Sequence, residues 1–77
     1  MEIKVLGPGC PKCHEAEKIV RAAVAEAGST ASIEKVSDFA DIARMGVFTT
    51  PAVVVDGQVK CAGRVPSMKD VLSWIQA

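Results

Sequence analysis

The sequence lacks an excess of charge of either sign and lacks any long apolar run. Nine basic residues balance nine acidic ones over 77 residues, so the formal net charge is zero. Binding to nucleic acid or to an anionic membrane needs a basic patch, which this balance argues against. No apolar stretch approaches the ~20 residues of a membrane span, and no basic segment with a long apolar stretch opens the chain. We therefore predict a cytoplasmic protein without nucleic-acid or membrane partners.

Cysteine is also scarce, and its count is odd. A small secreted disulfide framework normally has an even number of cysteines, whereas this chain has three. Two of them, Cys10 and Cys13, lie close together in the sequence. Hydrophobic residues make up 49% of the chain and charged ones 23%, which is a globular composition. The length predicts a single domain over residues 1–77, and we expect a monomer.

Hydrophobic periodicity predicts seven elements in the order β-α-β-α-β-β-α. Apolar or β-branched runs predict strands at residues 3–6, 31–36, 51–55 and 59–62. Apolar residues at three- and four-residue steps predict helices at residues 10–27, 39–45 and 68–75. Asp38 and Ser67 are the predicted N-caps of the second and third helices. Asp56-Gly57 predicts a tight hairpin between the last two strands.

The predicted order implies an α/β fold built on a mixed four-stranded sheet. The first two strands are joined by a helix, so we expect them to be parallel, whereas the hairpin strands are antiparallel. The continuously apolar strands 3–6 and 51–55 belong in the centre of the sheet. The mixed strands 31–36 and 59–62 belong at its edges. Helices are expected on both faces.

The most informative motif is Cys10-Pro11-Lys12-Cys13, where a strand has ended and a helix begins. Unpaired N–H groups and the dipole at a helix start favour a thiolate at Cys10, which lowers the pKa of that thiol. Lys12 adds positive charge nearby. Cys13 lies one turn into the helix, so its sulfur is expected beside that of Cys10. Such a pair can reduce a substrate disulfide through a mixed disulfide.

Three other interpretations of the motif stay open at this point. With His14 the stretch matches the C-x-x-C-H pattern of haem attachment. The competing interpretation is that His14 is a solvated residue on the polar face of the helix. Two thiolates on a loop can instead carry a soft ion such as Cu(I), although a structural zinc site would need further ligands from His14 and Cys61. Finally, both cysteines can be buried small apolar residues without a chemical role.

The remaining cysteine and the aromatic residues have simpler expectations. Cys61 lies two residues from Val59 on a predicted strand and therefore on the same face. We expect Cys61 to be a buried core residue, with a regulatory or dimer-forming thiol as the alternative. Trp74 is expected to be partly in the core. Phe39 and Phe48 are expected to pack against other residues rather than to bind.

The combination of a strand, Cys-Pro-x-Cys at a helix start, and Thr-Pro before an apolar strand resembles the thioredoxin superfamily. The similarity is greatest to its small glutaredoxin-like proteins, the redox-active disulfide proteins, and it extends from Ile3 to Ile75. Three segments carry it: residues 9–13, 46–52 and 63–66. The resemblance implies a thioredoxin-like fold and the activity of a dithiol-disulfide oxidoreductase or electron carrier, without a cofactor or a metal.

The resemblance also implies roles for single residues. Cys10 would be the nucleophile and Cys13 the resolving cysteine. The Thr50–Pro51 bond would be cis and would face the cysteine pair, with the backbone of Thr50 turned outward to pair with an extended substrate. Gly63 would leave room for that substrate. The expected substrate-binding residues are therefore Pro11, Lys12, Thr50, Pro51 and Gly63.

The chain departs from the better-known members of the superfamily at several positions. Gly9 stands where thioredoxin has a tryptophan, and residues 3–6 supply no carboxylate to act as base for Cys13. Lys12 stands where glutaredoxins have tyrosine, and residues 62–66 lack their Gly-Gly-x-x-Asp stretch, which helps to hold glutathione. These departures favour protein disulfides as substrates and a thioredoxin-reductase-type reductant over a glutathione couple.

Overall fold

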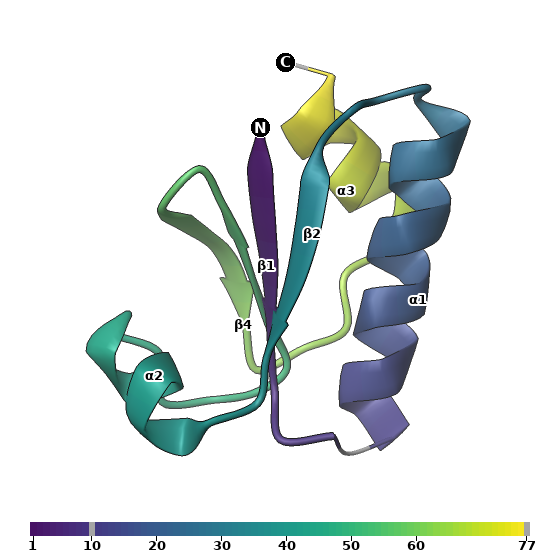
Figure 1. The fold of residues 1–77 in the computed structure, drawn as a ribbon. Coiled ribbons are helices and arrows are strands. Elements are labelled where there is room, and N and C mark those ends of the chain that lie inside the picture. Colours follow the sequence, from purple (N-terminus) through teal and green to yellow (C-terminus); the bar gives the residue numbers. More distant parts are fainter. Residues whose placement is uncertain (10, 77) are drawn as a thin grey trace.

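A computed structural model describes residues 1–9 and 11–76 of the chain. The seven elements follow the predicted order (Figure 1). They are β1 (Glu2–Leu6), α1 (Pro11–Glu26), β2 (Ser32–Val36), α2 (Phe39–Arg44), β3 (Ala52–Val55), β4 (Gln58–Ala62) and α3 (Met68–Ile75). The predicted start of the first helix at Cys10 lies outside the described residues.

The four strands form one mixed sheet in the order β2-β1-β3-β4. β1 pairs in parallel with β2 and antiparallel with β3, and β3 pairs antiparallel with β4. The prediction that the two most apolar strands are central and the mixed ones are at the edges is therefore confirmed. β3 is buried at every position, as its uninterrupted apolar sequence requires.

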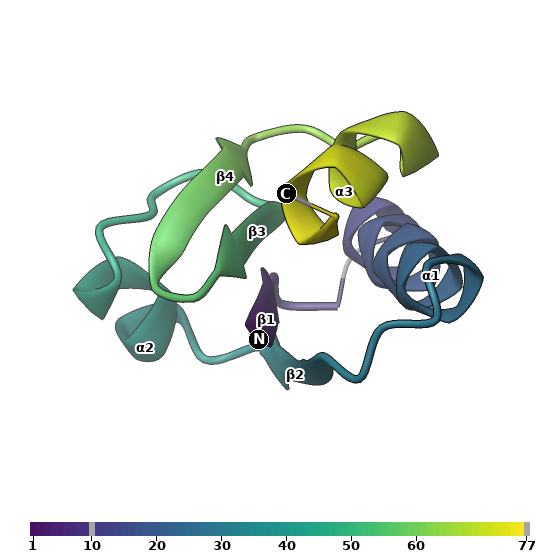
Figure 2. The ribbon, with the colours of Figure 1, turned by 90° about the horizontal axis from the view of Figure 1, so that it is seen from above.

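Helices cover both faces of the sheet, as predicted. Figure 2 shows α1 and α3 together on one face and α2 on the other. The residues that α1 buries lie at three- and four-residue steps: Cys13, Ala16, Val20, Ala23 and Val24. All of these except Cys13 pack with Ile3, Val5, Val53 and Val55 of the sheet and with Val71 and Ile75 of α3. Trp74 is half-buried against this cluster, as expected.

The face under α2 has a smaller core. Its buried members are Leu6, Val36, Ile42, Val47, Ala52 and Val54. Because α2 has only six residues and buries only Ile42, it covers only part of the sheet. An open cavity of about 520 Å³ lies on this side, lined by residues of β1 and of the β3–β4 hairpin together with Met45.

The expectation that Phe39 and Phe48 pack against other residues is wrong. Phe39 is 68% exposed and Phe48 is 84% exposed. Phe39 is the first residue of α2, whose single buried position is Ile42. In the following loop it is Val47 that enters the core, which leaves its neighbour Phe48 pointing to solvent.

The Asp56-Gly57 hairpin is confirmed, and it is joined to the start of β1. Both turn residues have positive φ, 49° at Asp56 and 82° at Gly57, which is the backbone that an Asp-Gly turn supplies. The N–H of Asp56 donates to the carbonyl of Glu2 at 2.8 Å, and the N–H of Glu2 donates to Oδ1 of Asp56 at 2.8 Å.

The β3–β4 ladder contains a bulge that corrects the expected faces of β4. Val53 pairs with Cys61 but Val54 pairs with Val59, so Lys60 is the extra residue. A bulge of this kind breaks the two-residue alternation of a strand. Cys61 is therefore buried on the α1–α3 face, whereas Val59 is 45% exposed and lines the cavity on the opposite side. The two residues do not share a face.

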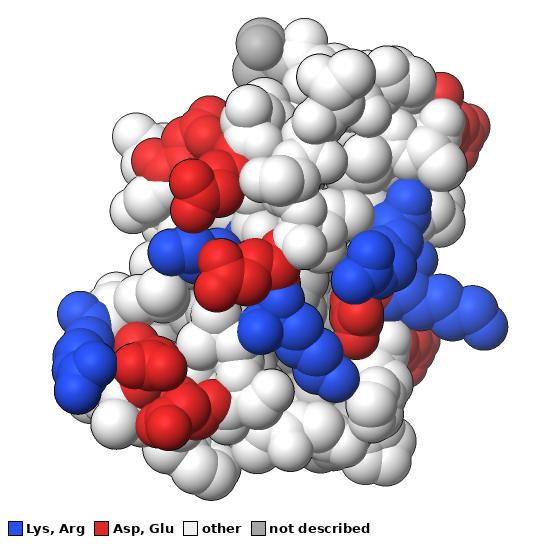
Figure 3. Space-filling view, viewed as in Figure 1, with Lys and Arg blue, Asp and Glu red and all other residues white. Residues whose placement is uncertain are grey.

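The surface shows no separation of charge on the side drawn in Figure 3. Lysine and arginine side chains alternate there with acidic ones, and the lower middle of the view is uncharged. Within the described residues, no helix has the length and apolar character that a membrane crossing requires.

Both predicted N-caps are confirmed. Asp38 accepts a hydrogen bond from the N–H of Ala40 at 2.8 Å. Ser67 accepts from the N–H of Asp70 at 3.1 Å, while the Asp70 carboxylate accepts from the N–H of Ser67 at 3.4 Å. This reciprocal pair is a capping box, which satisfies two N–H groups at the start of α3.

We predict that Ser67→Ala lowers the free energy of unfolding by about 1 kcal/mol, because it removes the cap of α3. Urea unfolding followed by circular dichroism measures the change. Ser37→Ala is the matched control, since Ser37 is exposed and its side chain makes no hydrogen bond within the described residues. Equal stabilities of the two variants would contradict the prediction.

Candidate redox site

Strand register brings the predicted site segments to one end of the sheet. Leu6, the last residue of β1, pairs with Val36 on one side and with Ala52 on the other. Ala52 in turn pairs with Ala62. The loop after β1, the loop before β3 and the loop after β4 therefore all meet at this end. The first of these loops leads to Pro11, Lys12 and Cys13 at the start of α1, and the other two contain the Thr50-Pro51 pair and Gly63.

Cys13 lies in the first turn of α1, which begins at Pro11. Its side chain is fully buried, while Pro11 and Lys12 before it are exposed. The other half of the predicted pair, Cys10, lies outside the described residues. The structure thus places the predicted resolving cysteine inside the protein, at the sheet end where the three loops meet.

The Thr50–Pro51 peptide bond is cis, as the resemblance implied. Pro51 is buried and Thr50 is half-buried. The carbonyl of Pro51 accepts a hydrogen bond from the N–H of Gly63 at 2.9 Å. This bond holds the Thr-Pro loop against the loop that follows β4.

Gly63 is required at its position for two reasons. Its φ is 82°, a conformation that side chains disfavour. In addition, a Cβ there would lie 3.2 Å from Oγ1 of Thr49. The sequence indicated Gly63 only through family resemblance, whereas the structure shows which neighbour it accommodates.

His14 lies one residue after Cys13 on α1 and faces β2. It is exposed, and its Nδ1 lies 3.4 Å from Nζ of Lys35 on β2. Lys35 also pairs with Glu17 at 3.4 Å, and Glu17 accepts from Arg21 at 3.0 Å. The hydrogen bond from Arg21, with further help from Lys35, lowers the pKa of Glu17. His14 is therefore part of a solvated polar surface of α1.

The described part of the chain has neither a metal-binding group of side chains nor a buried charged side chain. Outside Cys10, no three cysteine, histidine or acidic side chains come together to hold a metal ion. No charged or polar side chain among residues 1–9 and 11–76 is buried.

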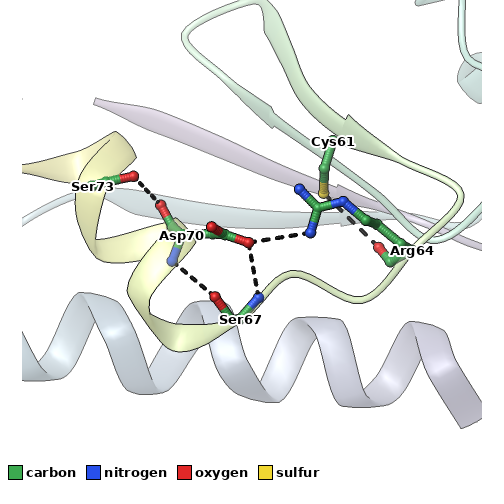
Figure 4. Close-up of polar contacts among 5 residues, drawn as sticks. All are labelled: Cys61, Arg64, Ser67, Asp70 and Ser73. Atoms are coloured by element: carbon green, nitrogen blue, oxygen red, sulfur yellow. Dashed lines mark hydrogen bonds and ion pairs between the residues drawn. The ribbon is translucent and has the colours of Figure 1, made fainter.

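Cys61 belongs to a different environment, between β4 and α3 (Figure 4). It is 7% exposed, and its Sγ donates a weak hydrogen bond to the carbonyl of Arg64 at 3.9 Å. The Arg64 side chain reaches from this loop to the Asp70 carboxylate at 3.2 Å. That hydrogen bond, more than any other contact, lowers the pKa of Asp70.

Burial raises the pKa of the Cys61 thiol, and the nearby Arg64 charge offsets only part of the effect. The prediction that Cys61 is a core residue is confirmed by its place in the cluster under α1 and α3. The sequence did not reveal the Arg64–Asp70 pair, because it depends on how the loop after β4 meets α3.

Comparison with known proteins identifies clear relatives. A family model described as a thioredoxin domain matches residues 1–76. A thioredoxin of Methanothermobacter thermautotrophicus is 38% identical over 71 residues, which cover 92% of each chain. A thioredoxin of Methanocaldococcus jannaschii is 41% identical over 69 residues, covering 90% of this chain and 79% of the relative.

We predict that Cys61 resists alkylation in the folded protein, because it is buried and its pKa is raised. In a Cys10→Ser/Cys13→Ser background only Cys61 reports, and intact mass follows its reaction with iodoacetamide. The control adds Cys61→Ala and Ala22→Cys to that background, which moves the thiol to an exposed position on α1. Cys61 is expected to react at least about tenfold more slowly than the exposed thiol of the control. Equal rates would indicate an accessible thiol.

Proposed function

The chain belongs to the thioredoxin family, and from that membership we propose that it is a dithiol-disulfide oxidoreductase whose redox pair is Cys10 and Cys13. The observation that carries the proposal is the position of Cys13. It is fully buried in the first turn of α1, at the sheet end where the cis Thr50–Pro51 loop and Gly63 also lie. Pro11 and Lys12, which precede Cys13, are exposed.

The proposed reaction has two steps. The Cys10 thiolate attacks one sulfur of a substrate disulfide, forming a Cys10–substrate bond and releasing the other substrate sulfur as a thiolate that takes up a proton. Cys13, deprotonated, then attacks Cys10, which closes a Cys10–Cys13 bond and releases the second substrate thiol. Two electrons pass from the protein dithiol to the substrate disulfide, and a reductant must restore the dithiol.

The substrate is proposed to be a protein disulfide bound across the Thr-Pro loop. Pro11 and Lys12, within the motif, are exposed, and the carbonyl of Pro51 accepts the hydrogen bond from Gly63. The backbone of Thr50 would pair with an extended substrate segment. The exposed ring of Phe48, two residues earlier, adds apolar surface to this loop. We propose that the protein works as a monomer in the cytoplasm.

Regeneration of the dithiol is proposed to depend on a thioredoxin-reductase-type partner rather than on glutathione. The loop after β4 carries Arg64, paired with Asp70, where glutaredoxins carry residues that help to hold glutathione. The alternative of a soft-metal carrier using the same thiolates draws no support from the relatives, which are both thioredoxins.

Replacing Cys10 and replacing Cys13 are predicted to stop the reaction at different steps. Cys10→Ser is expected to abolish reduction of a protein disulfide, whereas Cys13→Ser keeps the first step and accumulates mixed disulfides through Cys10. Non-reducing electrophoresis and intact mass after incubation with an oxidised protein substrate measure both outcomes. Cys61→Ala is the matched control and is expected to retain activity. Trapping by Cys10→Ser but not by Cys13→Ser would reverse the roles.

We also predict that reduced thioredoxin reductase, and not glutathione at cellular concentration, restores the oxidised protein. The physical reason is that residues 62–66 lack the stretch that helps to hold glutathione. Parallel assays follow the loss of the Cys10–Cys13 bond with each reductant, with a glutaredoxin as the control that responds to glutathione. Faster recycling by glutathione would contradict the prediction.

A further inference from the structure

Gly7 is the one described glycine whose backbone conformation does not require glycine. The other five have φ values between 63° and 99°, which side chains disfavour. Gly7 is not among the residues with positive φ. It lies directly after β1 and continues the parallel ladder, because its N–H donates to the carbonyl of Val36 at 2.8 Å. Some other constraint therefore acts at this position.

That constraint is the side chain of Cys13. A Cβ on Gly7 would lie 2.8 Å from Cβ of Cys13 and closer still to its Sγ. Rotation about χ1 would move the sulfur away but would leave the Cys13 Cβ where it is. Relief would need a shift of the loop, which is hydrogen-bonded to Val36, or of the first turn of α1. Cys13 is fully buried, so displaced atoms would meet packed neighbours.

We propose that Gly7 is a positioning residue for the second step of the redox reaction. Its bare backbone forms the wall against which the Cys13 side chain is held. The inference rests on the proposed function, because it assigns Gly7 to the resolving role of Cys13. It goes beyond that function in naming a residue, outside the Cys-Pro-Lys-Cys motif, that controls one of the two steps.

The two steps depend differently on this contact. In the first step, the sulfur of Cys10 attacks a disulfide that arrives from solvent. In the second step, Cys13 forms a bond to Cys10 while the Cys10–substrate bond breaks and the substrate thiolate leaves to take up a proton. The second step needs the Cys13 sulfur in line with that bond, and a misplacement of about 1 Å can cost about 10²-fold in rate. Displacement of Cys13 therefore slows resolution selectively.

Single-turnover kinetics test the split between the steps. Gly7→Ala is mixed with a peptide disulfide, quenched with acid, and analysed by intact mass for the mixed disulfide and for the closed Cys10–Cys13 form. Attack is expected to stay within about twofold of wild type, while resolution falls by about 10- to 100-fold. Unchanged resolution, or an equal loss in both steps, would overturn the proposal.

Gly57→Ala is the matched control for a general loss of stability. Gly57 lies in the hairpin turn, has a φ of 82°, and would have no neighbour within 4 Å of an added Cβ. Alanine there strains the backbone at the end of the sheet away from Cys13. Gly57→Ala is expected to lower stability while keeping the wild-type resolution rate. A slowed resolution step in this control would overturn the assignment to Gly7.

A double-mutant cycle tests the contact without any redox step. Cys13→Gly removes both atoms that an added Cβ would strike, so Gly7→Ala is expected to lower the urea midpoint in wild type but much less in Cys13→Gly. Additive effects would overturn the proposal. If Gly7→Ala alone does not fold, folding of the double variant supports the contact and its failure to fold contradicts it. If the wild type reduces no disulfide, the proposed function fails, and the cycle still decides whether Gly7 holds Cys13.

Discussion

The pairing of β1 with both of its neighbours is the constraint on which the rest of the structure depends. Leu6 pairs with Val36 of β2 on one side and with Ala52 of β3 on the other, and the N–H of Gly7 adds a hydrogen bond to Val36. Because β1 ends there, the chain must turn toward α1 at a fixed place. The loop before β3 and the loop after β4 reach the same end through the β1–β3 and β3–β4 registers.

The two faces of the sheet are used differently. The face under α1 and α3 holds the larger core, which includes Cys61; α1 also buries Cys13 in its first turn. The other face has only the short α2 and stays partly open. In a domain of 77 residues the larger core supplies most of the apolar burial. Cys13 is therefore carried by the helix that packs on this larger core.

Close packing at the site takes the place of buried charge. Within the described residues no charged side chain is buried, and Cys13 packs closely against the backbone of Gly7. Gly7 leaves room for Cys13, and Gly63 leaves room for Thr49. Both glycines lie at the sheet end where the loops meet. The lack of a side chain at Gly7 and at Gly63 therefore helps to shape this end of the sheet.

The sequence by itself determined the order of elements, the sheet centre and edges, and the caps at Asp38 and Ser67. Each depends on neighbours close in the chain: apolar periodicity, a cap hydrogen bond, or a two-residue turn. Resemblance to the thioredoxin superfamily further predicted that the Thr50–Pro51 bond is cis and that Gly63 belongs to the site. The role of Cys10 as the nucleophile is a prediction from the Cys-Pro-Lys-Cys motif.

Tertiary structure decided the features that depend on residues distant in the chain. The bulge between Val53 and Val54 moved Val59 to the opposite face from Cys61, which no alternation pattern within β4 reveals. Phe48 is exposed because its neighbour Val47 occupies the small core under α2. The requirement for glycine at position 7 is invisible in the sequence, because it arises only when the end of β1 meets the first turn of α1.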